Sequence, residues 1–293
     1  MIKKQKSFGD IKPCIICKKT SFTKWAKLEN YQARKCNNCG MISVNPTPNQ
    51  EFLNKYYEGY SKLYTGNSKL DKKSLTLLDQ RKLVYQIDKK WITKFIDQGK
   101  VLDVGCSGGQ FLSHFNSKRW NRFGIDVDEE AVRLAKSKFK INARVGDLFE
   151  LEFRDKFDLI LFRGVIEHFS DPMKALKKCS TILKKNGYLF ITATPTCDAF
   201  AFDVYREKWK LFTPPEHLHF FSVSLLTKSL KKYGFELIDH HYQYAETPYA
   251  NPEKDFKKIK NDLILASQNK RNKIKTSNPF PGSMMTAVWK KIV

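Results

Sequence analysis

The sequence predicts an α/β fold built on a doubly wound parallel sheet, with a small cysteine-bearing segment in front of it. Three observations support this prediction. Apolar runs alternate with helical stretches through the middle of the chain, a glycine-rich turn follows the first of these runs, and two Cys-x-x-Cys pairs lie within the first 40 residues. Strands and helices that alternate at this spacing are typical of parallel sheets with helical crossovers.

The composition is that of a globular protein. The chain has 293 residues, of which 41% are hydrophobic, and its 22 Phe can fill a sizeable core. No stretch of about 18 apolar residues is present, so we expect no membrane span. The basic N-terminus has no apolar stretch behind its charges, so we expect no signal peptide and a cytoplasmic location.

The net charge of +23 raises the question of nucleic-acid binding. Lys outnumbers Arg by 43 to 10, although Arg is the better residue for phosphate forks and base edges. The charge is also uneven, with +12 on residues 1–99, +5 on 100–245 and +6 on 246–293. We interpret most of it as a solvated Lys-rich surface and keep nucleic-acid binding as the alternative.

The first 45 residues are predicted to form a zinc ribbon. Cys14 and Cys17 form one pair, Cys36 and Cys39 form the other, and eighteen residues separate them. This spacing suits four thiolates around one Zn²⁺. A disulfide or a redox-active pair is the alternative, but two matched pairs without an export signal favour the metal. A closed four-cysteine site has no open coordination position, so we expect a structural role for the ion.

Residues 46–98 are predicted to form a linker and a helical cap. Tyr56, Tyr57, Tyr60 and Tyr64 lie close together, and residues 70–97 show apolar residues at helical spacing. The tyrosines could cover a ligand of the following domain or pack against the cysteine-bearing segment.

Residues 99–293 are predicted to form the main domain. Strands are expected at 101–104, 122–125, 158–162 and 187–193, with helices at 110–118, 129–138 and 172–185. Two further strands are expected within 235–243 and 285–293. Between them lies a Lys-rich helical insert of about 250–283.

The glycine-rich turn lies in "VLDVGCSGGQFL", residues 101–112. It departs from the dinucleotide fingerprint G-x-G-x-x-G, because Ser107 replaces the second glycine and the third is displaced. Asp103 precedes Gly105 by two residues and would repel a pyrophosphate. A ligand with positive charge and no phosphate fits better. S-adenosylmethionine has a sulfonium and an ammonium group, so we predict that Gly105, Ser107 and Gly109 let the backbone approach this cofactor.

Two further acids follow predicted strands. Asp126, with Val127 beside it, comes 23 residues after Asp103, where an acid binds ribose hydroxyls in such folds. Asp147 follows the third strand and can accept from the adenine amino group, with Leu148 packed nearby. A single strand-end Asp often only caps a helix. Three acids at successive strand ends favour cofactor binding.

Residues 80–245 resemble the class I S-adenosylmethionine-dependent methyltransferases, which have a Rossmann-like fold. The matching motifs are "VLDVGCSGGQF", "GIDVDEEAV", "GDLFEL", "FDLILFRGVIEHFSDP" and "LKKNGYLFITATP", in that order. The motifs "GVIEHFSDP" and "PPEHLHFFS" are similar to those of ubiquinone-biosynthesis-type enzymes and of methyltransferases from bacterial surface-polysaccharide clusters. The four N-terminal cysteines fit the polysaccharide group. Two departures are Ser107 and Thr196, which stands where this branch has Asn.

Three histidines are candidates for a general base, because imidazole titrates near neutral pH. His168 follows the fourth strand at the sheet edge where ligands bind. His217 and His219 alternate, so on an extended segment they face one side, and the resemblance implies that their loop lines the acceptor site. Each could instead be a structural histidine bonded to the backbone.

Two more residues near the fourth strand are candidates. Arg163 lies beside the expected methionine end of the cofactor, where it can bind an acidic group. An ion pair with a nearby acid is the equal alternative. Glu167 is a candidate for bonding to substrate hydroxyls or to the cofactor.

The resemblance therefore implies a methyltransferase. The leading hypothesis is O-methylation of a sugar, a sugar nucleotide or another small polar metabolite in surface-polysaccharide biosynthesis. The alternative is an RNA methyltransferase that uses the basic zinc ribbon to grip nucleic acid. A degenerate, non-enzymatic cofactor binder is a third reading, which the acids at 103, 126 and 147 disfavour.

Overall fold

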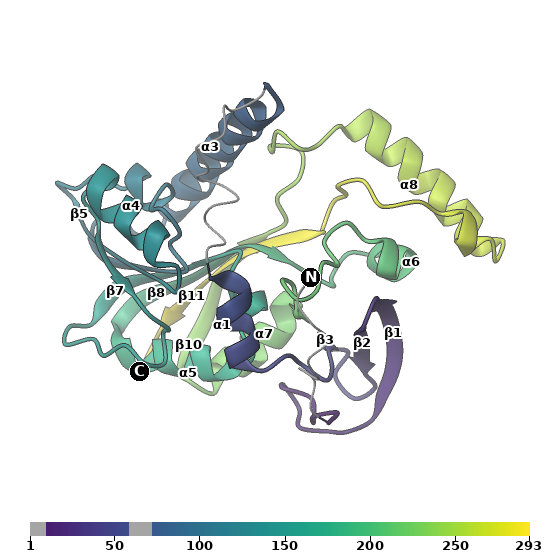
Figure 1. Cartoon of the computed structure of the whole chain (residues 1–293), viewed down its shortest axis with the longest axis horizontal. Coiled ribbons are helices and arrows are strands. Elements are labelled where there is room, and N and C mark those ends of the chain that lie inside the picture. The colour runs from purple at the N-terminus through teal and green to yellow at the C-terminus, as the bar shows by residue number, and fades with distance from the viewer. Residues whose placement is uncertain (1–9, 59–71) are drawn as a thin grey trace.

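The computed structural model of the chain describes residues 10–58 and 72–293 (Figure 1). Tyr60 and Tyr64 of the predicted tyrosine cluster lie outside this part. The remaining chain forms two sheets, a large one in the middle and a small one at its side.

The central sheet has seven strands in the order β10-β11-β8-β7-β4-β5-β6. In chain order they are β4 (Gly99–Val104), β5 (Trp120–Asp126), β6 (Asn142–Val145), β7 (Phe157–Arg163), β8 (Leu183–Pro195), β10 (Phe235–His241) and β11 (Met284–Lys291). Strands β6, β5, β4, β7 and β8 are parallel neighbours, whereas β11 runs antiparallel to β8 and β10. The predicted α/β, Rossmann-like fold is confirmed, with one reversed strand that the sequence pattern did not indicate.

Helices cover both faces of this sheet. They are α3 (Lys72–Ile92), α4 (Glu129–Phe139), α5 (Pro172–Ile182) and α7 (Val223–Lys231). The starts of the last three are capped by Asp128, Asp171 and Ser222, whose side chains accept from backbone N–H groups of the first turn. These caps fix the residue at which each of the three helices begins.

The expected helix at 110–118 is wrong. The segment forms a 3₁₀ turn, η1 (Leu112–His114), followed by an irregular connection to β5. Phe111, Leu112 and Phe115 are buried in this segment. These apolar residues are spaced as in a helix because a short connection is buried under α3. A full helix does not fit, since only a few residues remain before β5 begins at Trp120.

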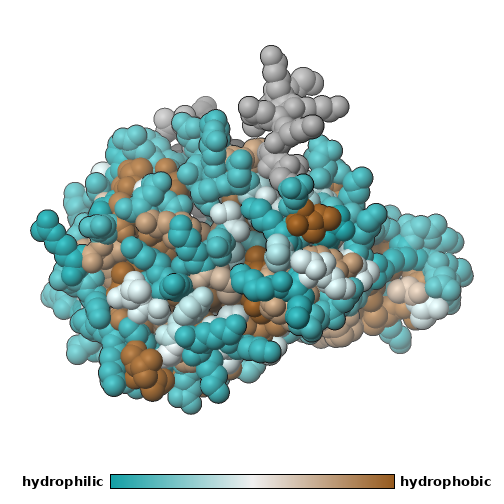
Figure 2. Space-filling view, turned by 90° about the horizontal axis from the view of Figure 1, so that it is seen from below, coloured by the Kyte–Doolittle hydropathy of each residue, from teal (hydrophilic) through white to brown (hydrophobic). Residues whose placement is uncertain are grey.

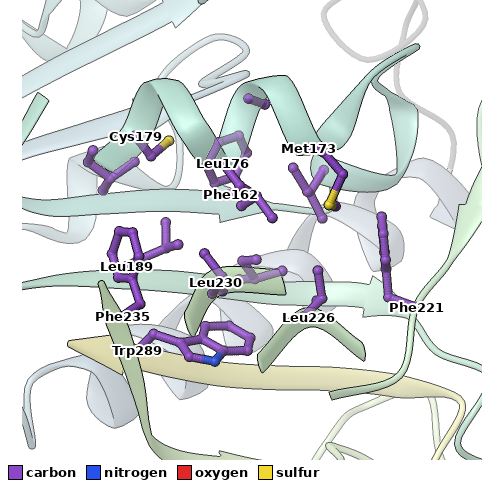
Figure 3. Packing of buried hydrophobic residues seen from close by; sticks show 14 of the residues in the cluster. Phe162, Met173, Leu176, Cys179, Leu189, Phe221, Leu226, Leu230, Phe235 and Trp289 are labelled. Carbon is purple, nitrogen blue, oxygen red and sulfur yellow. The ribbon is translucent and has the colours of Figure 1, made fainter. Parts of the chain in front are cut away.

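The core lies on the two faces of the central sheet. On one face, residues of α5 and α7 meet the strands, as the side chains of Phe162, Leu176, Leu189, Leu230 and Trp289 show (Figure 3). On the other face a second cluster lies under α3 and α4 and includes Trp91, Phe115, Trp120 and Phe190. Both layers are apolar, which explains the near-continuous hydrophobic runs of β7 and β8.

The small sheet combines three N-terminal strands with one strand from much later in the chain. Its order is β1-β2-β3-β9, with β1 (Phe22–Leu28), β2 (Tyr31–Cys36), β3 (Ile42–Val44) and β9 (His219–Phe220). We call β1, β2 and β3, with the cysteine-bearing loops, the cysteine ribbon. Its Trp25 stacks on Phe202 with ring centroids 4.4 Å apart and donates to Asp203 at 2.7 Å. The division of the chain at residue 45 stays a prediction, and the shared sheet means that the ribbon is built into the main domain.

In the described residues, three helices lie outside the central layers. Helix α1 (Gln50–Tyr57) follows the ribbon, and α6 (Phe202–Tyr205) lies beside it. The insert contains α8 (Pro252–Ser267) and the 3₁₀ turn η4 (Arg271–Lys273), away from the central sheet in Figure 1. Tyr205 donates to Asp262 of α8 at 2.8 Å, which anchors the insert to α6.

The surface is mainly polar. Figure 2 shows one face on which hydrophilic residues predominate and hydrophobic residues occur in small groups. Across residues 10–58 and 72–293, none of the helices combines the length and apolar character that crossing a membrane requires.

Candidate active site

A cavity of about 760 Å³ opens at the carboxyl ends of the central strands. Its walls are the turns after β4, β5, β6 and β7, together with side chains of α1 and α3. Strand β4 lies in the middle of the parallel strands, with β5 and β6 on one side of it and β7 and β8 on the other. The strand order therefore reverses at β4, and the cavity lies at this topological switch point, where open α/β sheets bind ligands. Its volume is within the range of small-molecule sites.

The glycine-rich turn forms the floor of this cavity. Gly105 has a φ of +72°, and a Cβ there would lie 2.7 Å from a methyl carbon of Val165. Ser107 also has a positive φ, +49°, and its N–H donates to Asp126 at 2.8 Å. Both residues line the cavity, and their contact with the cofactor stays a prediction.

Gly109 has a different role from the predicted one. A Cβ at this position would lie 2.6 Å from Ile141 and 3.0 Å from Ala135 of α4. Its hydrogen therefore faces the helix, away from the cavity walls formed by the described residues. Gly109 permits close packing of α4 on the turn, and we do not retain it as a cofactor contact.

The acids after β5 and β6 lie on one wall. Asp126, Val127, Asp147 and Leu148 all line the cavity. Asp126 accepts from the Ser107 and Asp128 N–H groups at 2.8 and 3.0 Å, and Asp147 accepts from the Phe149 N–H at 2.7 Å. These bonds fix both carboxylates at the strand ends. Their contacts to ribose and adenine stay a prediction.

Asp103 is buried directly beneath the cavity floor. It is 2% exposed, and its Oδ1 has no hydrogen-bond partner among the described residues. Burial raises its pKa to about 8, although the nearby Arg163 acts in the opposite direction. A buried carboxyl oxygen without a partner costs free energy, so the site suits a ligand that brings a hydrogen-bonding cation. The ammonium group of S-adenosylmethionine is such a cation.

Arg163 is held by an acid from α3. Its Nε donates to Asp88 at 2.7 Å, and its guanidinium lies 4.5 Å from the ring centroid of Tyr85. Asp88 is fully buried and also accepts from Thr192 at 3.0 Å and from Gln243 at 2.5 Å. The ion-pair alternative for Arg163 is therefore observed, while its side chain still lines the cavity.

Sequence reasoning missed Asp88. The signal was an acid on the inward face of a predicted amphipathic helix, in register with Val84, Trp91 and Ile92. A charged residue in an apolar stripe requires a buried partner, and Arg163 at the end of β7 is that partner.

Glu167, His168 and His217 form a cluster beside the cavity, and His168 is the member that lines it. A carboxylate oxygen and one ring nitrogen from each histidine lie within 4.8 Å of one another. His168 lines the cavity from the 3₁₀ turn η2 (Ile166–His168), and the ring centroid of His217 is 5.2 Å from its own. Tyr57 of α1 forms a 2.9 Å hydrogen bond with His168 Nδ1. The Nε2 atom of His168 has no partner among the described residues.

Burial determines the protonation of this group. It lowers the pKa of His168 well below its usual range, and the neighbouring His217 adds to the effect. Burial also lowers the pKa of His217 and raises that of Glu167 to about 8. Both imidazoles are consequently neutral at pH 7, and each has one ring nitrogen with a free lone pair.

His219 lies outside the cavity walls. It is fully buried, and its Nε2 donates to the Phe169 carbonyl at 3.0 Å. His217 precedes β9 and instead donates from Nδ1 to the Leu211 carbonyl at 2.6 Å. The two side chains therefore have different surroundings, contrary to the expectation that they face one side. We do not retain His219 as a candidate base.

The four N-terminal cysteines meet as predicted. The Sγ atoms of Cys14, Cys17, Cys36 and Cys39 all lie within 4.8 Å of one another, and the closest pairs are 3.5 Å apart. None of the cysteines in the described residues is in a disulfide. A zinc ion with Zn–S bonds of about 2.3 Å requires S···S edges of about 3.8 Å, which this cluster can provide.

A protein-family model of a methyltransferase domain matches residues 79–240. The chain belongs to this family. An uncharacterised protein of Methanocaldococcus jannaschii is 26% identical over 188 residues, which cover 64% of this chain and 82% of that protein. A ubiquinone biosynthesis O-methyltransferase of Pelagibacter ubique is 28% identical over 172 residues, 52% of this chain and 72% of the relative.

Solved methyltransferases share the fold. Magnesium protoporphyrin IX methyltransferase of Synechocystis, with bound SAH, superposes with a TM-score of 0.55 at 12% identity, covering 83% of this chain and 100% of that one. A SAM-dependent methyltransferase of Thermotoga maritima gives 0.51 at 18% identity, covering 82% and 97%. The protein is thus an S-adenosylmethionine-dependent methyltransferase, and its acid-lined cavity fits that cofactor.

Replacement of Asp103 by Asn should weaken S-adenosylmethionine binding at least about tenfold, because a charged hydrogen bond to a buried carboxylate is lost. The pKa of about 8 keeps Asp103 mostly protonated at pH 7 without ligand. A bound cation favours the ionised form, so wild-type binding should release protons and strengthen as the pH rises toward 8. Calorimetry in two buffers of different ionisation enthalpy measures both effects.

The matched control is Asp158→Asn. Asp158 accepts from the Lys100 N–H near the opposite end of the sheet, so its replacement should leave the affinity unchanged. Equal affinity and equal proton release in wild type and Asp103→Asn would contradict the proposed role of Asp103.

Proposed function

We propose that this methyltransferase O-methylates a small polar acceptor, such as a sugar or a sugar nucleotide. The observation that supports this most is the pair of neutral imidazoles, His168 and His217, of which His168 lines the cavity. A hydroxyl acceptor must lose its proton as the methyl group is transferred, and a neutral imidazole can receive it.

In this proposal the cofactor supplies a methyl group already activated by its sulfonium. The protein aligns the acceptor and excludes water. His168 lines the cavity, and its Nε2 receives the proton when Nδ1–H donates to the Tyr57 hydroxyl. His217 stands beside it and keeps its pKa low, so that the imidazole is unprotonated before the reaction.

The acceptor class has two further supports. The relatives named ubiquinone biosynthesis O-methyltransferases act, by their names, on oxygen. Arg81 and Lys82 of α3 line the cavity, so a phosphate of a sugar nucleotide would meet positive charge there. The motif resemblance and the four cysteines support a place in surface-polysaccharide biosynthesis.

We also propose that Cys14, Cys17, Cys36 and Cys39 bind one structural Zn²⁺. Support comes from the four converging Sγ atoms and from their free state. The set is closed by four thiolates, so an ion there would stabilise the ribbon without entering the reaction.

The acceptor can be found with S-adenosylmethionine that carries a radioactive methyl group. The purified enzyme is incubated with a host extract that has been fractionated by size, with and without RNase. We expect label in a small, RNase-resistant fraction, where mass spectrometry should place the methyl group on oxygen. Label in large RNase-sensitive material would support the RNA alternative instead. Label on nitrogen or carbon would contradict a hydroxyl acceptor.

His168→Gln should lower kcat by about 10²- to 10⁴-fold with little change in cofactor affinity, because it removes the base. His240→Gln is the matched control, since His240 is exposed on β10 and should be dispensable. An unchanged kcat in His168→Gln would remove His168 from the mechanism.

The pH profile provides a second test of the same pair. The groups that face His168 are Tyr57, Glu167 and His217. Because burial and His217 lower the pKa of His168, wild-type activity should persist below pH 6.5 and fall only as the imidazole protonates. In His217→Gln one of these causes is absent, so the acidic limb should move to higher pH.

Cys36→Ser should remove the metal and lower the thermal midpoint, because a zinc site with three thiolates is incomplete. Elemental analysis of the wild type should give about one zinc per chain. Cys197→Ser is the control, because Cys197 lies outside the cysteine cluster, and its zinc content should match the wild type. Wild-type protein without zinc would contradict the proposal.

A further inference from the structure

One buried imidazole lies between the cysteine ribbon and the turn that bears the proposed base. His219 is on β9, where its backbone pairs with Ser43 of β3. Its ring is fully buried, and Nε2 donates to the Phe169 carbonyl at 3.0 Å. Phe169 follows His168 directly, so the ring of His219 bonds to the backbone on the C-terminal side of His168.

The preceding residue makes the corresponding bond on the other side. The Leu218 N–H donates to the Glu167 carbonyl at 3.0 Å, and the Val44 N–H donates to the Leu218 carbonyl at 2.8 Å. Hydrogen bonds therefore run from β3 of the ribbon, through Leu218, to the residue before His168. Leu218 and His219 thus form hydrogen bonds to the residues on both sides of His168.

Helix α1 holds the same turn from another direction. Tyr57 bonds to His168 Nδ1, and the Gln50 side-chain oxygen accepts from Ser170 at 2.6 Å. Helix α1 directly follows the ribbon in the chain. The turn at 167–170 is therefore joined to the N-terminal segment twice, directly by α1 and indirectly by β9, which pairs with β3.

The chemistry of His219 indicates why a histidine is present. Its Nδ1 is buried and has no partner among the described residues, and burial lowers the pKa of the ring to about 4. An unpartnered buried nitrogen costs free energy that an apolar side chain would avoid. The gain is the Nε2–H donor, which supplies a hydrogen bond to the Phe169 carbonyl.

We propose that His219 is a positioning residue: its ring fastens the His168-bearing turn to the edge strand of the cysteine ribbon, so that His168 faces the acceptor. This proposal rests on the proposed function, in which His168 receives the acceptor proton. It assigns the ribbon a part in catalysis through β3 and β9, with no contact between the cysteines and the substrate.

Two amide variants test the proposal. In His219→Gln the side-chain nitrogen can take the place of Nε2 and still donate to Phe169. In His219→Asn the nitrogen is one bond short of that place. Both side chains are neutral amides, so their burial costs are similar and the main difference is reach.

The readout is the titration of His168 in protein labelled with ¹³C-histidine, followed by NMR. The His168 signal is identified by its absence from His168→Gln. We expect His219→Asn to raise the pKa of His168 by about half a unit or more as the turn loosens and admits water, and His219→Gln to leave it near the wild-type value. Thermal midpoints and S-adenosylmethionine affinity, measured alongside, should differ little between the two variants.

Equal His168 titration in wild type, His219→Gln and His219→Asn would overturn the proposal, and so would equal shifts in both variants. The measurement needs no acceptor, so its outcome is independent of the methyl-transfer assays. If the two His219 variants differ as expected but His168→Gln leaves turnover unchanged, the proposed function is contradicted. The positioning role of His219 then still holds.

Discussion

Strand β9 is two residues long, yet its pairing with β3 joins segments about 175 positions apart in the sequence and holds the ribbon against the turn that bears His168. Such a contact is entropically costly to form, since a long loop must close before any contact stabilises it. The stacking of Trp25 on Phe202 and the bond from Trp25 to Asp203 join the same two segments and offset this cost. The ribbon and the turn η2 therefore depend on one another.

The cofactor half of the cavity depends on two buried acids that differ in their partners. Asp88 accepts from Arg163, Thr192 and Gln243, so its charge is compensated within the fold. Asp103 has an oxygen without a partner in the described chain and a pKa of about 8. The first acid stabilises the contact between α3 and the sheet. The second has hydrogen-bonding capacity that the described residues leave unused, which is why the same kind of side chain is structural in one place and is proposed to bind a cation in the other.

The sequence predicted the features that depend on local pattern. Asp126 and Asp147 could be placed because a strand end is visible in a short window, and the cysteine pairs because their spacing is that of a metal site. The bond between Arg163 and Asp88 spans 75 positions, and that between Gln243 and Asp88 spans 155. These contacts, the reversed β11 and the burial of His219 follow from tertiary packing, which no local pattern encodes. Gly109 lies between these two cases. The local pattern predicted the turn that contains it, but not that a Cβ at this position would point at α4.

The two histidines of the His-x-His motif differ mainly in which ring nitrogen donates to a backbone carbonyl. A carbonyl oxygen can only accept, so each imidazole must place its proton on the nitrogen that faces the carbonyl. In His217 that nitrogen is Nδ1, which leaves the Nε2 lone pair available in the cluster with His168. In His219 it is Nε2, and the remaining lone pair is buried without a partner in the described chain. The position of one backbone carbonyl against each ring thus decides which nitrogen keeps its lone pair.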